Sequence, residues 1–110
     1  MKEIKAYVRE NMRDAVMDAL AAIPGLPGIA VVHLREYGHA ADDGGLAKAG
    51  MAKLELDVPD ALAEPVVDTI LRHARTGDGH AGDGKIFVSN LGEAVRISDG
   101  ARGEAAVTRR

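Results

Sequence analysis

The chain has 110 residues, the size of one domain, and its composition, 46% hydrophobic with three aromatic residues, predicts a globular protein with an aliphatic core. The absence of cysteine excludes a disulfide framework and a thiolate metal site. A net charge of −3 without a basic block argues against nucleic acid as the main partner, and no apolar run approaches the length of a membrane span or a signal-peptide core. We therefore expect a cytoplasmic protein with no membrane insertion.

The pattern of the first half of the chain predicts a strand, a helix and a second strand. Residues 4–8 alternate apolar and polar side chains, which predicts a strand with one covered face. Asn11 is expected to cap a helix over 12–23, where apolar residues recur at helical spacing until the proline and glycine residues of 24–28. Residues 29–37 predict a second strand. Because both of its faces are partly apolar, one of them needs a cover, and we expect an oligomer interface there.

Residues 38–50 are predicted to form a mobile loop, because their composition is dominated by glycine and alanine without a periodic apolar face. Alternation then predicts a third strand over 52–58. A second helix begins at Pro59-Asp60, and Pro65 is expected to delay its start or to bend it. The buried stripe of this helix is Leu62, Val66, Ile70 and Ala74.

Two short strands follow, over 85–88 and 94–97. The segment from Asp99 onward has little apolar content and is expected to order only against a neighbouring subunit. The order strand, helix, strand, strand, helix, strand predicts an α+β ferredoxin-like βαββαβ sandwich, an antiparallel sheet with two helices on one face, in a single domain over residues 1–110.

The segment 76–85 is the most distinctive part of the sequence. Four glycines lie within eight residues, Lys85 follows, and an apolar strand begins at once. Glycines let backbone N–H groups turn inward into a concave anion site, and a lysine adds a fixed charge beside it. The alternative is a glycine-rich turn without a ligand, and the spacing is not that of a P-loop, which requires Gly-Lys-Ser/Thr at the start of a helix.

The string Gly82-Asp83-Gly84-Lys85-Ile86-Phe87-Val88 resembles the signature of the PII signal-transduction family. The likeness covers nearly the whole chain: Thr76-Gly77 precedes the signature, and the segments 58–60, 67–70, 94–97 and 100–104 and the dipeptide Tyr37-Gly38 match as well. In the family's terms, residues 38–50 are the T-loop, residues 76–85 the B-loop, and residues 98–110 the C-terminal tail. The chain resembles a divergent, PII-like member with a short T-loop.

The resemblance implies a homotrimer that binds an adenine nucleotide, ATP, ADP or AMP, in the clefts between subunits, with the participation of Mg²⁺ left open. The residues that match the nucleotide site are Gly38, beside the adenine; Gly82, Asp83, Gly84 and Lys85 of the B-loop; and Arg96, which reaches the phosphates from the neighbouring subunit. The family's second phosphate-binding arginine is replaced here by Ser98. We expect either that Arg102 substitutes for it or that nucleotides with fewer phosphates are preferred.

Other departures narrow the expected function. Five residues, 77–81, separate Thr76 from Gly82-Asp83-Gly84, where the family usually has three. The position of the family's 2-oxoglutarate-binding glutamine is Ala40, and the chain contains no glutamine, so 2-oxoglutarate is expected to bind weakly or not at all. The T-loop contains no Tyr, Ser or Thr, which excludes nucleotidylation or phosphorylation of a hydroxyl there.

The histidines and the acids give no catalytic set. A divalent metal could find ligands in His39 with Asp42 and Asp43, or in His39 with His80. The favoured interpretation is that these histidines are exposed and have no ligand role, so no metal site is predicted. No nucleophile stands beside an ordered base and acid, so we expect no enzyme activity.

We expect a regulatory protein whose T-loop contacts a protein partner in response to a small-molecule effector. By the resemblance that partner is a membrane transporter or a metabolic enzyme, with heavy-metal efflux and inorganic-carbon or carboxysome functions as contexts of divergent members. The alternatives are a metal- or small-anion-binding trimer that has lost nucleotide sensing and a purely structural trimer.

Overall fold

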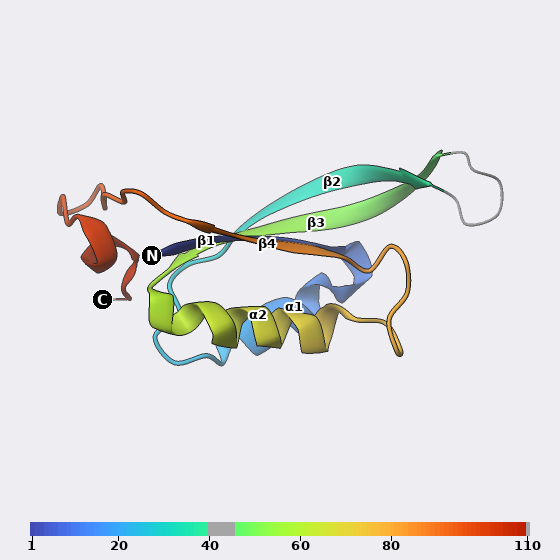
Figure 1. The fold of residues 1–110 in the computed structure, drawn as a ribbon, viewed down its shortest axis with the longest axis horizontal. Coiled ribbons are helices and arrows are strands. Elements are labelled where there is room, and N and C mark those ends of the chain that lie inside the picture. The colour runs from blue at the N-terminus through green and yellow to red at the C-terminus, as the bar shows by residue number, and fades with distance from the viewer. Residues whose placement is uncertain (40–45, 110) are drawn as a thin grey trace.

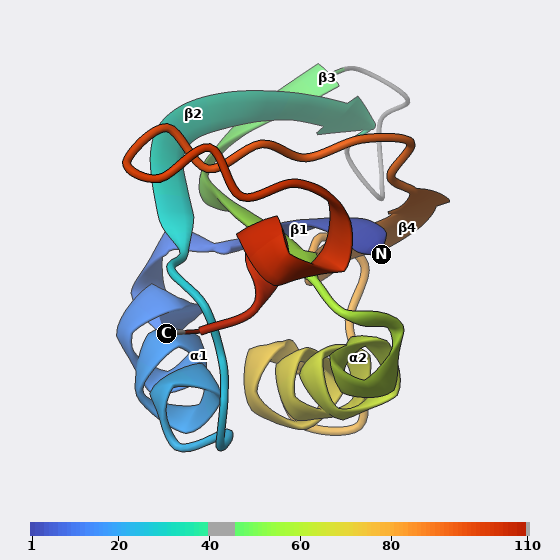
Figure 2. The same cartoon turned by 90° about the vertical axis from the view of Figure 1, so that its left-hand side faces the viewer.

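The computed structural model describes residues 1–39 and 46–109, with the side chain of His39 excepted. Along the chain the elements are β1 (Lys2–Arg9), a 3₁₀ turn η1 (Glu10–Met12), α1 (Arg13–Ala21), β2 (Ala30–His39), β3 (Leu46–Val58), α2 (Asp60–Ala74), β4 (Gly84–Asn90) and a 3₁₀ turn η2 (Gly103–Val107). The strands form one antiparallel sheet in the order β2-β3-β1-β4. Figures 1 and 2 show both helices on the same side of this sheet, which confirms the predicted ferredoxin-like sandwich.

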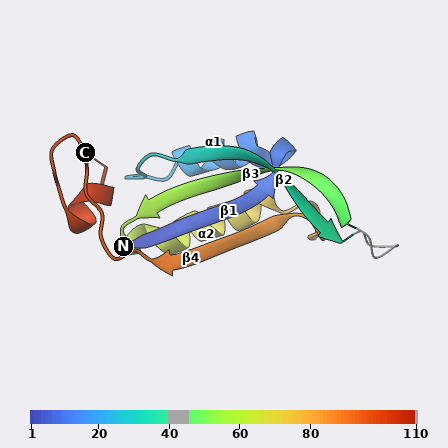
Figure 3. The same cartoon turned by 90° about the horizontal axis from the view of Figure 1, so that it is seen from above.

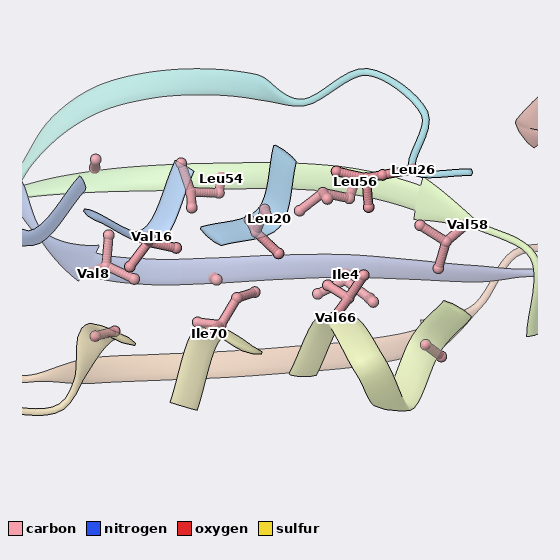
Figure 4. Close-up of a cluster of buried hydrophobic side chains, with 14 residues drawn as sticks. Ile4, Val8, Val16, Leu20, Leu26, Leu54, Leu56, Val58, Val66 and Ile70 are labelled. Atoms are coloured by element: carbon pink, nitrogen blue, oxygen red, sulfur yellow. The ribbon is translucent and has the colours of Figure 1, made fainter. Parts of the chain in front are cut away.

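The core lies between the sheet and the two helices. Alternate residues of β1 and β3 point into it, and α1 and α2 each contribute residues spaced by four positions, as their sequence patterns predicted. The fully buried large side chains, all of which Figure 4 labels, are Ile4, Val8, Val16, Leu20, Leu54, Leu56, Val58, Val66 and Ile70. Because all of them are aliphatic, the three aromatic residues are left for surfaces and clefts.

In the described part of the chain, neither α1 nor α2 covers the opposite face of the sheet (Figure 2). The register places Tyr7 between Lys53 and Lys85 on that face, and Lys5 between Glu55 and Phe87. Tyr7 and Phe87 meet edge to face, with ring centroids 6.0 Å apart. We call this surface the open sheet face.

β2 has the two-sided character that its sequence indicated. Val31 packs against the core, whereas Val32, which pairs with Lys53, lies on the open sheet face and is 45% exposed. The predicted oligomer interface on that side stays a prediction.

The strands β2 and β3 are longer than predicted. Seven residues of the expected loop 38–50 are in strands, because β2 continues to His39 and β3 begins at Leu46; residues 40–45 lie outside the described part of the chain. The ladder pairs Glu36 with Ala49 and Gly38 with Ala47. These small residues pair through their backbones, so a ribbon forms without the apolar alternation on which the sequence reading depended. The outer part of the ribbon, residues 34–39 and 46–51, extends away from the helices and is called the arm (Figures 1 and 3).

Two local predictions for the helices were wrong. Asn11 caps nothing, because it lies inside η1, and α1 begins at Arg13 without a side-chain cap. α2 begins at Asp60 as the sequence indicates and is not delayed by Pro65, which lies inside the helix on its exposed side. The N-terminal amine contacts Asp60 Oδ1 at 2.8 Å, in the first turn of α2.

The predicted fifth strand over 94–97 is also absent from the described chain, which has there an isolated bridge between Val95 and Arg102. The segment folds back on itself instead: Arg96 N donates to Ala101 O, and Gly100 N donates to Arg96 O, each at 2.8 Å. The prediction that the tail orders only against a neighbouring subunit was also wrong, because η2 buries Val107 within the same chain.

Candidate functional site

A cleft lies between the B-loop and the inner surface of the arm. Its volume is about 430 Å³, and it is lined by Arg9, Glu36, Gly38, Ala47, Ala49, Met51, Ala81, Gly82, Gly84 and Lys85. Four of the residues singled out in the sequence, Gly38, Gly82, Gly84 and Lys85, therefore meet in one place. Gly38 belongs to β2, whereas Gly84 and Lys85 belong to β4 and Gly82 to the loop before it. These strands are at opposite ends of the sheet order, and the twist of the arm over the sheet brings them together (Figure 1).

The glycines of the B-loop are required by the backbone. Gly82 and Gly84 have φ values of 93° and 115°, which L side chains rarely adopt. A Cβ atom at Gly84 would lie 1.7 Å from the carbonyl oxygen of Tyr7, the residue before Val8, which pairs with Gly84 in the β1–β4 ladder. The loop can therefore enter β4 at this point only with glycine.

Asp83 shapes the loop from the inside. Its Oδ1 accepts hydrogen bonds from Thr76 Oγ1 at 2.6 Å and from Arg9 Nε at 3.0 Å, and its Oδ2 accepts from the backbone N–H groups of His80 at 2.9 Å and Thr76 at 3.1 Å. The Thr76 hydroxyl and these further donors hold the pKa of Asp83 far below the ordinary range of an aspartate. Direct binding of nucleotide by Asp83 stays a prediction, and its contacts give it the role of closing the loop.

His80 holds the segment 77–81, which the resemblance predicts to be longer than usual. The imidazole Nδ1 lies 2.7 Å from Thr76 O and 2.9 Å from Thr76 Oγ1. Because that hydroxyl donates its proton to Asp83, Nδ1–H is the donor to the carbonyl. The longer segment is folded back onto Thr76.

Lys85 is the last residue of the B-loop and carries the first side chain of β4, on the open sheet face beside Tyr7. Within residues 1–39 and 46–109, no ion pair engages its amine. It lines a second cleft of about 390 Å³ as well, in which Tyr7, Tyr37 and Phe87, all the aromatic residues of the chain, meet. An exposed, unpaired ammonium next to two open clefts is available to an anion.

Arg96 and Arg102 are far from this cleft in the same chain, since the B-loop and the C-terminal tail lie at opposite ends of the molecule (Figure 1). Arg96 binds its own tail, donating from Nη1 to Asp99 Oδ2 at 2.9 Å and from Nη2 to Thr108 O at 3.0 Å and to Ala105 O. The backbone N–H of Ala101 and the Arg96 guanidinium keep the pKa of Asp99 below its usual value. Arg102 is 69% exposed and lies 3.6 Å from Glu93. Whether either arginine reaches a neighbour's cleft stays a prediction.

The sequence reading missed Arg9, His80 and the side chain of Thr76. Thr76 lies in the dipeptide Thr76-Gly77 that precedes the signature and matches the family as well, so its role could have been assigned from the resemblance. Arg9 gives no local signal, because its partner Asp83 is 74 residues away in the chain.

Among the described residues no group of three His, Asp or Glu side chains is placed to hold a metal ion. The candidate set of His39, Asp42 and Asp43 lies outside what the structure describes. In the described part of the chain no helix has both the length and the apolarity to cross a bilayer.

Comparison with known proteins identifies the family and agrees with the fold. The family model of nitrogen regulatory protein P-II matches residues 1–101. The P-II protein of Bradyrhizobium diazoefficiens is 36% identical, and P-II 1 of Escherichia coli is 34% identical, each over 97% of this chain and the whole of the relative. The solved structure of Arabidopsis thaliana PII bound to citrate superposes with a TM-score of 0.80 at 31% identity, over 99% of this chain and 91% of that one. The chain therefore belongs to the nitrogen regulatory protein P-II family, whose members are non-enzymatic signalling regulators.

Proposed function

We propose that this protein is a trimeric nucleotide sensor that binds ATP, ADP or AMP in the cleft between the B-loop and the arm. The observation that carries the proposal is the meeting of Gly38, Gly82, Gly84 and Lys85 in one cleft. Glycines with positive φ expose backbone N–H groups to an anion, and Lys85 adds an unpaired positive charge. The phosphates therefore belong at the B-loop end.

The arm is suited to the base. Gly38 and its ladder neighbours Ala47 and Ala49 line the cleft with side chains no larger than a methyl group. A flat aromatic ring can approach such a backbone closely, and this explains in physical terms why a glycine occupies position 38.

The trimer completes the site. The open sheet face leaves Val32 and Phe87 exposed, which favours its use as an interface, and a tail arginine can reach a B-loop only from another subunit. Of the two candidates Arg102 is the more available, because Arg96 is engaged by the tail.

No Tyr, Ser or Thr occurs in residues 38–50, so the ligand itself would control how the T-loop meets its partner, a transporter or a metabolic enzyme.

Titration calorimetry of Lys85→Ala with ATP tests the proposal. We expect a loss of about 1.5–3 kcal/mol in binding, the scale of a charge-assisted hydrogen bond, with the trimer intact by light scattering. Lys48→Ala is the matched control: its ladder partner is Tyr37, so it projects from the side of the arm opposite Gly38, away from the cleft, and should leave the affinity unchanged. Equal affinity of the wild type and Lys85→Ala would remove Lys85 from the site.

A further inference from the structure

The end of β1 places a second cation beside the B-loop. Arg9 Nε donates to Asp83 Oδ1 at 3.0 Å, and Nη2 donates to Ala81 O at 3.2 Å. A Cβ atom at Gly82 would lie 3.3 Å from Nη2. The guanidinium thus lies against the backbone of Gly82 and forms part of the cleft wall. The side chain of Arg9 is 32% exposed.

The contact with Asp83 leaves most of the N–H donors of Arg9 available. The Asp83 carboxylate also receives the Thr76 hydroxyl and the N–H groups of Thr76 and His80, so its negative charge is stabilised mainly by the loop. A guanidinium has five N–H donors in a planar fork, and the contacts with Asp83 and Ala81 employ two of them in the described structure. Donors therefore remain for an anion in the cleft, while the two fixed contacts remove the rotational freedom that an arginine ordinarily loses on binding.

We infer that Arg9 is a phosphate-binding residue of the nucleotide cleft, aimed at the phosphates by Asp83 and the carbonyl of Ala81. The inference rests on the nucleotide site proposed above. Arg9 lies against Gly82, and Lys85 follows Gly84 in the chain, so phosphates at the B-loop meet positive charge from two strands of the same chain. This supplies in cis the cation that is lost where Ser98 stands.

The contribution of Arg9 grows with the charge of the ligand. Each added phosphate brings negative charge to the B-loop, whereas the adenosine part is unchanged. A residue that merely shapes the loop would affect AMP, ADP and ATP alike, because all of them need the same loop conformation. The ratio of ATP to AMP affinity therefore separates phosphate binding from loop shaping.

Calorimetric titrations with AMP, ADP and ATP test this on four proteins: the wild type, Arg9→Met, Arg9→Lys and Thr76→Val. For Arg9→Met we expect the ATP affinity to fall by about tenfold or more, with a much smaller change for AMP. Arg9→Lys keeps the charge and should retain most of the ATP preference. Thr76→Val removes one donor to Asp83 Oδ1 but leaves the contact of Arg9 Nε with the same oxygen, and should lower the three affinities by a common factor.

Ser98→Arg in the Arg9→Met background provides a rescue, because it restores a phosphate cation without rebuilding the contact with Asp83. Recovery of the ATP to AMP ratio supports the inference. If Arg9→Met lowers ATP and AMP affinity equally, Arg9 only shapes the loop and the inference is wrong, while the nucleotide site stands. If the wild type binds none of the three nucleotides, the proposed function falls with it.

Discussion

At the scale of the residue, Gly84 is the position where the fold and the candidate site constrain each other most strongly. The B-loop has to approach β1 so closely here that the carbonyl of Tyr7 occupies the space of a side chain. The same glycine, with its neighbour Gly82, exposes the backbone to the cleft. Close packing of two backbones and access for an anion therefore have a single cause, the absence of a Cβ atom.

Replacement of Gly84 by alanine should destabilise the protein by about 3 kcal/mol or more, because positive φ and a clash with backbone act together. Urea denaturation would measure the change. Gly92→Ala is the matched control, since Gly92 is exposed, its φ is not positive, and a Cβ atom there meets nothing within 4 Å. Similar stability of the two variants would mean that the B-loop can shift away from Tyr7 at little cost.

At the scale of the element, the sequence predicts the buried parts of this protein well and its exposed ribbon poorly. The alternation of residues 4–8 and the stripe of α2 are visible because one side of each is apolar and covered. Residues 46–50 have no covered side, and their strand is maintained by pairing with β2, which no local pattern records. The prediction of a fifth strand was wrong for a related reason. The apolar side chains of Val95 and Ile97 are exposed, and the backbone of Arg96 forms its hydrogen bond with Ala101 and not with a neighbouring strand.

The candidate site divides in the same way. Gly82, Gly84 and Lys85 are adjacent in the chain and form a recognisable signature. Arg9 and the small face of the arm reach the cleft through tertiary pairing, and the sequence alone does not connect them with the B-loop.

The C-terminal tail depends on Arg96. Its guanidinium donates to the carbonyls of Ala105 and Thr108, on either side of the buried Val107. We expect Arg96→Met to raise amide hydrogen exchange over residues 101–108, because the carbonyls of Ala105 and Thr108 lose the hydrogen-bond donor that they share. Arg102→Met, which removes an exposed side chain 3.6 Å from Glu93, should leave this exchange nearly unchanged. Unaltered protection in Arg96→Met would show that Val107 alone orders the tail.

At the scale of the whole molecule, the proposed nucleotide cleft at the B-loop and the C-terminal tail with its arginines lie at opposite ends of one chain (Figure 1). A site that uses both has to be built between subunits, and the open sheet face offers the surface on which subunits can meet. We therefore propose a cleft that two neighbouring subunits share.

Mixed trimers of Lys85→Ala and Arg102→Ala test the shared site most directly. Each variant alone should bind ATP weakly, because every one of its clefts lacks a cation. When equal amounts are unfolded and refolded together, about a quarter of the interfaces should combine an intact Lys85 with an intact Arg102 from the neighbouring chain. Calorimetry of the mixture should then recover that fraction of tight ATP sites. A mixture that binds ATP no better than the two separate variants would contradict a cleft completed by the neighbouring subunit.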